Sequence, residues 1–175
     1  MSDKLNDSLD GKRNNFNELH LNEMILKAAE DGDLLGVKWC LSRDQSVVMA
    51  VDSDLYTPLH RSAYNNHTEV MRLLIGRGAD VRARTLDGWT PLHCASKWAN
   101  TGAADLLINC GADINAVSDG GNTALHLAAS HNNRQLLELF LHNQDIDITL
   151  TNDSGETAYQ IAKRSSPLHQ LWQYL

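Results

Sequence analysis

Three segments of the chain share one motif at one fixed spacing: Thr57-Pro58-Leu59-His60, Thr90-Pro91-Leu92-His93 and Thr123-Ala124-Leu125-His126. The first threonines of neighbouring segments are 33 residues apart. A period of about 20 to 50 residues is typical of solenoids, in which one supersecondary unit stacks on the next. The period therefore predicts a repeat array, whose long surface suits the binding of another macromolecule better than it suits a catalytic pocket.

The unit that begins at Thr57 indicates how one repeat is built. Thr57 is a favourable N-cap, and Pro58 suits the first helical position because the N–H of that position has no intrahelical partner. A second helix from Thr68 carries apolar residues at i, i+3 and i+4, starting at Val70, and Gly76 is typical of its C-terminus. We therefore expect two short helices in each repeat, joined to the next repeat by a turn.

Superposing the units on one another predicts five repeats. The predicted segments are a flexible polar tail over about 1–19, a degenerate first repeat over 20–50, full repeats over 51–83, 84–116 and 117–150, and a shortened C-terminal capping repeat over 151–175 in which Pro167 interrupts the second helix. Atypical ends are expected because a terminal repeat has only one neighbour against which to bury its apolar face.

Composition narrows the possible partners. The 175 residues carry a net charge of −7, which disfavours direct binding to a nucleic-acid backbone, because that needs clustered lysine and arginine. Neither an apolar run long enough to span a membrane nor a secretory signal is evident, so we expect an intracellular protein, nuclear or cytoplasmic. The three cysteines, Cys40, Cys94 and Cys110, have no paired spacing and are expected to be reduced thiols.

Residues 85–95, in which Asp87-Gly88-Trp89 precedes Thr90-Pro91-Leu92-His93, resemble the consensus of the ankyrin repeat family. The resemblance covers about residues 21–175. It implies an all-α ankyrin-repeat solenoid of about five stacked helix-turn-helix repeats with projecting β-turns. It also implies a monomeric, non-enzymatic scaffold without a cofactor, which binds a partner protein along its concave face and its turn tips.

Two stretches, Tyr56–Tyr64 and Asp87–Trp98, carry a narrower resemblance within that family. This narrower resemblance implies a nuclear or nucleocytoplasmic protein that takes part in transcription control and male germ-cell differentiation. The alternative function is therefore a nuclear regulator, which would act through protein partners because of its negative charge.

The conspicuous histidines and cysteine favour framework roles over chemistry. His60, His93 and His126 recur at one repeat position, so stacking spreads them along the solenoid, too far apart to share a metal ion. The family resemblance implies that each is a hydrogen-bonding post between neighbouring turns. Cys94 follows His93, but adjacent helical residues do not face each other, and no orienting third group is evident. We expect neither a catalytic site nor a metal site, and a thiol hydrolase ranks last among the functions.

The four tryptophans divide into two groups. We expect Trp39, which aligns with Leu73 on the buried face of a second helix, and Trp172, in the closing segment, to be core residues. Trp89 lies at a turn tip and Trp98 at the end of a first helix. Both are candidates for partner contact, since tryptophan is enriched at interface hot spots, but a turn tryptophan can also lie flat on the next repeat.

The predicted partner-binding strip consists of the residues at these two repeat positions and at the acidic turn tips. Its members are Tyr56, Tyr64, Asn65, Asp87, Trp89, Lys97, Trp98, Asp119, Asn122 and His131. A basic spot at Arg77, Arg82 and Arg84 is expected to be a solvated loop. The family resemblance also implies that Asn115, in Ala-Asp-Ile-Asn, is a possible site for asparagine hydroxylation.

Overall fold

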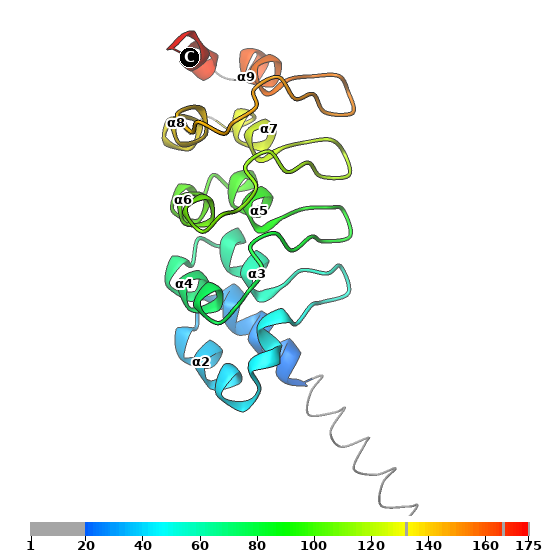
Figure 1. Cartoon of the computed structure of the whole chain (residues 1–175), viewed down its shortest axis with the longest axis vertical. Coiled ribbons are helices and arrows are strands. Elements are labelled where there is room, and N and C mark those ends of the chain that lie inside the picture. Colours follow the sequence, from blue (N-terminus) through cyan, green and yellow to red (C-terminus); the bar gives the residue numbers. More distant parts are fainter. Residues whose placement is uncertain (1–19, 132, 166, 175) are drawn as a thin grey trace, which may run out of the picture.

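The computed structural model describes residues 20–131, 133–165 and 167–174, and the polar tail expected over residues 1–19 lies outside this part of the chain. The described chain is an elongated stack of helix pairs with loops that project from one side (Figure 1). One column of helices, called the inner helices here, lies next to the projecting loops, and the outer helices form a second column behind it (Figure 1).

Each repeat contributes one helix to each column. The inner helices are residues 20–31, α3 (Pro58–Tyr64), α5 (Pro91–Lys97), α7 (Ala124–Ala129) and α9 (Ala158–Ser165). The outer elements are α2 (Leu34–Arg43), α4 (Thr68–Gly76), α6 (Thr101–Asn109), α8 (Arg134–Leu141) and the 3-10 helix η2 (Pro167–Tyr174), while a further 3-10 helix, η1 (Gln45–Met49), follows α2. The predicted all-α solenoid of about five helix pairs is confirmed.

The shared threonine begins the inner helices as the sequence predicts. The Thr57 hydroxyl accepts the backbone N–H of His60 at 3.3 Å, and the His60 side chain reaches back to the backbone N–H of Thr57. The same reciprocal capping box begins α5 at Thr90 and α7 at Thr123. Because these caps satisfy N–H groups that have no intrahelical acceptor, they fix the start of each short helix.

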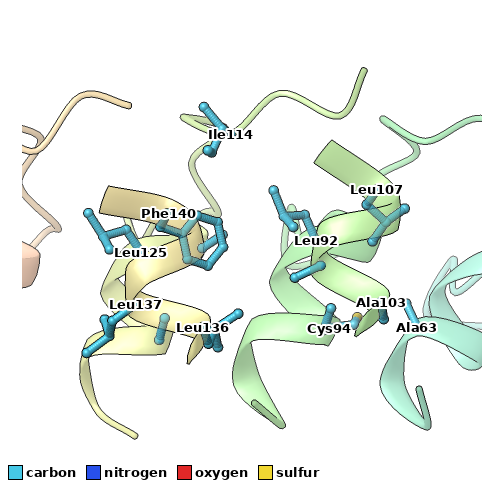
Figure 2. Close-up of a cluster of buried hydrophobic side chains, with 14 of the residues drawn as sticks. Ala63, Leu92, Cys94, Ala103, Leu107, Ile114, Leu125, Leu136, Leu137 and Phe140 are labelled. Atoms are coloured by element: carbon cyan, nitrogen blue, oxygen red, sulfur yellow. The ribbon is translucent and has the colours of Figure 1, made fainter. Parts of the chain in front are cut away.

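The core lies between the repeats rather than inside any one of them. Figure 2 shows apolar side chains of successive helix pairs, such as Leu92 and Leu107 in one layer and Leu125 and Phe140 in the next, gathered between the ribbons. Leu92, Leu107 and Phe140 are fully buried. A single helix pair could not bury these side chains, so the stability of each repeat depends on its neighbours.

The projecting loops are narrow turns with little sheet character. Among the described residues the β-structure consists of two isolated bridges, Val117 with Thr123 and Thr151 with Thr157. The tip of the second loop turns at Gly88, whose φ is 70°. The first loop places Leu55 at the equivalent position with a φ of 63°, which is strained for a residue with a side chain.

The two tryptophans expected in the core have different environments. Trp172 is partly buried against the last core layer, as predicted. The prediction for Trp39 is wrong, since its side chain is 45% exposed, with the Arg43 guanidinium 5.1 Å from the ring centre. The reason is that α2 belongs to the first helix pair of the described chain, so no other described repeat packs on this part of the helix.

Candidate functional site

The repeated histidines connect each projecting loop to the next one. The backbone N–H of Thr57 donates to His60 Nδ1 at 3.2 Å, so Nε2 carries the ring hydrogen and donates to the backbone carbonyl of Trp89 at 3.1 Å. His93 and His126 make the equivalent bonds to the carbonyls of Asn122 and Glu156. The framework role predicted for these three residues is confirmed.

Burial keeps these imidazoles neutral. It lowers the pKa of His60 to about 4, because the charged ring would lose its hydration in the core. Burial also lowers the pKa of His93 and of His126. Neutral rings with both nitrogens bonded have no free position for a substrate or a proton-transfer partner.

Cys94 lacks the properties of a nucleophile. Its side chain is fully buried, and burial raises the pKa of the thiol to about 12. Both ring nitrogens of the adjacent His93 bond to other groups, namely Thr90 and Asn122. Since the reactive form of cysteine is the thiolate, this pair is unsuited to covalent catalysis.

Two kinds of feature are absent from the part of the chain that the structure describes, a cluster of metal-ligating side chains and a membrane-spanning helix. Over residues 20–131, 133–165 and 167–174, no group of three or more His, Cys, Asp or Glu side chains is arranged to hold a metal ion. None of the helices formed by these residues has the length and apolar character needed to cross a bilayer.

Two aromatic rings from neighbouring repeats meet at the ends of the inner helices α3 and α5. Tyr64 and Trp98 have ring centres 4.8 Å apart and an interplanar angle of 54°, and their side chains are 39% and 50% exposed. The pair is held in place from the next turn, where Asn100 Nδ2 donates to the backbone carbonyl of Tyr64 at 2.7 Å. Lys97, immediately before Trp98, is exposed. Predicted strip residues from two repeats therefore form one exposed aromatic patch.

The two aromatic residues at the bases of the loops are less accessible. Trp89 is partly buried against the core, with its ring centre 6.3 Å from that of His93. Tyr56 is also partly buried, lies 5.6 Å from the His60 ring and has the Arg61 guanidinium 5.0 Å from its ring centre. Both rings therefore pack on their own repeats and present only part of their surface to solvent.

Three polar members of the predicted strip bridge neighbouring repeats or cap turns. Asn65 Nδ2 donates to the backbone carbonyl of Glu30, 35 residues earlier, at 3.1 Å. Asn122 Oδ1 accepts a bond from Asn152 Nδ2 at 3.2 Å. His131 Nδ1 lies 2.9 Å from the backbone carbonyl of Leu127. These contacts give each side chain a structural role whether or not it also meets a partner.

The acidic members of the strip lie at the loop tips. Asp87 is exposed, and its backbone carbonyl accepts the N–H of Asp119 at 3.0 Å, which links two neighbouring tips. The Asp119 carboxylate is 3.7 Å from the Arg84 guanidinium. Arg84 also donates to the backbone carbonyl of Val117 at 2.8 Å. Arg82 likewise donates to the backbone carbonyl of Gly111 at 3.3 Å, so two of the three arginines predicted to be solvated connect repeats, and that prediction is wrong for them. The tips form a continuous edge.

Three exposed aliphatic residues on this edge were missed by the sequence reasoning: Leu55, Leu86 and Val117, with exposed fractions of 39%, 59% and 42%. A signal for Leu86 was available, because a leucine directly before the Asp87-Gly88 turn has no helical face to occupy. The edge of the solenoid therefore combines carboxylates with exposed aliphatic side chains.

Asn115 lies between the third and fourth repeats. Its Nδ2 donates to the backbone carbonyl of Asp145 at 2.7 Å, and its Oδ1 accepts the N–H of Asp147 at 2.9 Å. Both side-chain polar groups are therefore engaged in joining two loops, which gives this residue a structural role independent of any modification.

A large hollow on the described surface lies away from all these residues. It encloses about 670 Å³ between the outer helices α6 and α8 and is lined by polar side chains such as Asp105, Glu138 and His142 together with Ile108 and Leu139. None of the predicted strip residues lines it. We place the candidate site on the inner helices, where exposed aromatic residues gather, because buried aromatic side chains dominate the energetics of protein interfaces.

Comparison with known proteins identifies relatives of this chain. The family model described as ankyrin repeats (3 copies) matches residues 25–118, and a second, ankyrin repeats (many copies), matches residues 107–162. Ankyrin repeat domain-containing protein 49 of Bos taurus is 56% identical over 152 residues, or 86% of this chain and 64% of the bovine protein. The Homo sapiens protein of the same name is 54% identical over 151 residues, covering 86% of this chain and 63% of the human protein. The chain thus spans less than two thirds of the length of these relatives.

Proposed function

Because the chain belongs to the ankyrin repeat family, we propose that it is a non-enzymatic scaffold that binds a partner protein along its inner helices and loop tips. The observation that carries the proposal is the exposed ring pair of Tyr64 and Trp98. Holding two large rings in solvent is unfavourable unless a partner covers them, and rigid aromatic side chains bind with little loss of conformational entropy.

Affinity capture with variants of the aromatic patch tests this proposal. The double variant Tyr64→Ala/Trp98→Ala removes both rings, and a third change, Lys97→Glu, reverses the adjacent charge. We expect the combined variant to capture at least tenfold less partner protein than the unchanged protein does. Circular dichroism should be unchanged, because all three side chains are exposed.

Trp39→Ala is the matched control, since it also removes a tryptophan that is about half exposed in the described chain but lies on the outer helix α2. This variant should retain the partner fully. Equal retention by the unchanged protein and the combined Tyr64, Lys97 and Trp98 variant would refute the location of the site.

We further propose that the scaffold acts as a monomer. We also propose that it is located in the nucleus or the cytoplasm, and the alternative function, a nuclear regulator, requires the nucleus. A part in transcription control and male germ-cell differentiation stays a prediction. The net charge of −7 favours action through proteins. Tight, salt-sensitive binding of the purified chain to duplex DNA would contradict this mode of action, and a sedimentation coefficient that rises with concentration would contradict the monomer.

A further inference from the structure

The first helix pair lies at one end of the described stack, and its surface is hollowed between the two helices. One hollow, of about 260 Å³, is lined by His20, Leu21, Met24, Trp39 and Arg43. A second hollow of similar volume extends from Met24 toward Gly36 and Cys40 and is more polar, since Lys27, Asp31 and Asp33 also line it. Because Met24 lines both, the two form one depression between residues 20–31 and α2, called the end groove below.

The part of the end groove beside Trp39 is apolar. Two of the large apolar side chains that are exposed in the described chain, Met24 and Trp39, line the end groove, with exposed fractions of 36% and 45%. Terminal repeats normally have a polar outer face, because no neighbour covers them. A half-exposed tryptophan and a methionine side by side in one hollow favour the packing of another segment on them.

The segment that precedes His20 in the sequence is the one nearest to the groove. Residues 1–19 lead into His20, which itself lines the end groove. Phe16, one of the two phenylalanines of the chain, precedes His20 by four residues, so an extended chain places it within about 14 Å of that residue. Leu19 and, farther from His20, Leu9 provide additional apolar side chains.

We propose that residues 1–19 cover the end groove and place the Phe16 ring against Trp39 and Met24. The chain thereby caps its own first repeat. A phenylalanine suits the site, because an aromatic ring gains most from burial against a second aromatic face and an adaptable methionine. The Arg43 guanidinium beside Trp39 has no acidic partner among the described residues, and Glu18 brings a carboxylate to the same end of the segment. This inference is independent of the proposed partner site, which lies on the inner helices.

A double-mutant cycle on the full chain tests the contact. Phe16→Ala, Trp39→Ala and the double variant are unfolded with urea, and the coupling between the two changes is obtained from the four unfolding equilibrium constants. We expect a coupling of at least fivefold. Two controls use residues outside the proposed contact: Leu35→Ala, on α2 but not lining the groove, should be additive with Phe16→Ala, and Asn15→Ala should be additive with Trp39→Ala.

Hydrogen exchange adds a readout that does not depend on global unfolding. In the full chain, Phe16→Asp should increase deuterium uptake over residues 20–43 and leave uptake in α5 and α7 unchanged. The proposal would be overturned if the effects of Phe16→Ala and Trp39→Ala on stability were additive and Phe16→Asp left deuterium uptake over residues 20–43 unchanged. Protection of residues 20–43 that disappears on dilution would also overturn it, since a second copy of the chain would then be the occupant. Capture of the partner should be unaffected by Phe16→Ala, so that failure here is distinguishable from failure of the proposed function.

Discussion

His93 Nε2 lies 2.9 Å from the backbone carbonyl of Asn122, 29 residues later in the chain, and this bond joins the start of one inner helix to the base of the next projecting loop. His60 and His126 form the same link in the neighbouring repeats. The stack is therefore held together by a row of buried neutral imidazoles in addition to its apolar core.

These imidazoles make the stability of the fold depend on pH. In the unfolded chain a histidine titrates near 6.5, whereas burial lowers the pKa of His60 to about 4. Between these values the unfolded state binds more protons, so stability is complete above pH 6.5 and is lost as the pH falls toward 4. His60 alone contributes a loss of about 3 kcal/mol, and His93 and His126 add to it.

Urea denaturation between pH 7.5 and 4.5 measures this loss. The variant His60→Gln should reduce the pH dependence, whereas His142→Gln, at an exposed position, should leave it unchanged. A midpoint that is constant across this range would contradict the assigned role of the buried rings.

Ser96 has an unfavourable position in α5. Its side chain is fully buried, and its Oγ has no hydrogen-bond partner among the described residues. We expect Ser96→Ala to stabilise the protein by about 1 kcal/mol, because it removes a desolvated hydroxyl without creating a large cavity. Ser62→Ala is the control, since that hydroxyl donates to the backbone carbonyl of Leu59 at 3.1 Å and its removal should give no gain. Thermal unfolding of both variants measures these changes in stability, and a Ser96→Ala variant that is no more stable than the unchanged protein would contradict the prediction.

Leu55 occupies a backbone conformation that favours glycine. With a φ of 63° it costs about 1 kcal/mol relative to glycine, so Leu55→Gly should raise the unfolding free energy by about that amount. Gly88→Ala is the reverse change at the equivalent loop position. It should destabilise the protein by more, because the added Cβ would also collide with the Asp119 carboxylate and the Arg84 guanidinium. Urea denaturation measures both unfolding free energies. Equal values for the two variants would contradict the prediction that the backbone of Leu55 is strained.

Asn115 is predicted to stabilise the junction between the third and fourth repeats. Asn115→Ala removes two bonds to the following loop and should destabilise the protein by about 1–3 kcal/mol, whereas Asn109→Ala, at an exposed side chain bonded within α6, should change stability by less than about 0.5 kcal/mol. Hydroxylation of Asn115 is a separate prediction. Peptide mass spectrometry of protein from cells tests it, and finding only the unmodified residue would count against it.

Much of this architecture could be predicted from the sequence, because one motif is repeated at a fixed period. Thr57 and Pro58 specify a helix start through local backbone chemistry, and the recurrence of His60 at positions 93 and 126 indicates a framework role. The candidate site was harder to predict. Trp89 and Trp98 looked alike in the sequence, yet Trp89 packs on its own repeat while Trp98 is half exposed beside Tyr64.

The sequence by itself determined the repeat period, the helix starts and the apolar faces that stack, because each depends on residues close together in the chain. Only the tertiary structure decided which side chains stay in solvent. The pairing of Tyr64 with Trp98 joins two repeats, and Trp39 is exposed at the end of the described stack, where no other described helix pair covers it, so neither is encoded within a single repeat. Exposure is a property of the stack, since a residue at one repeat position is buried or free according to what its neighbours place beside it.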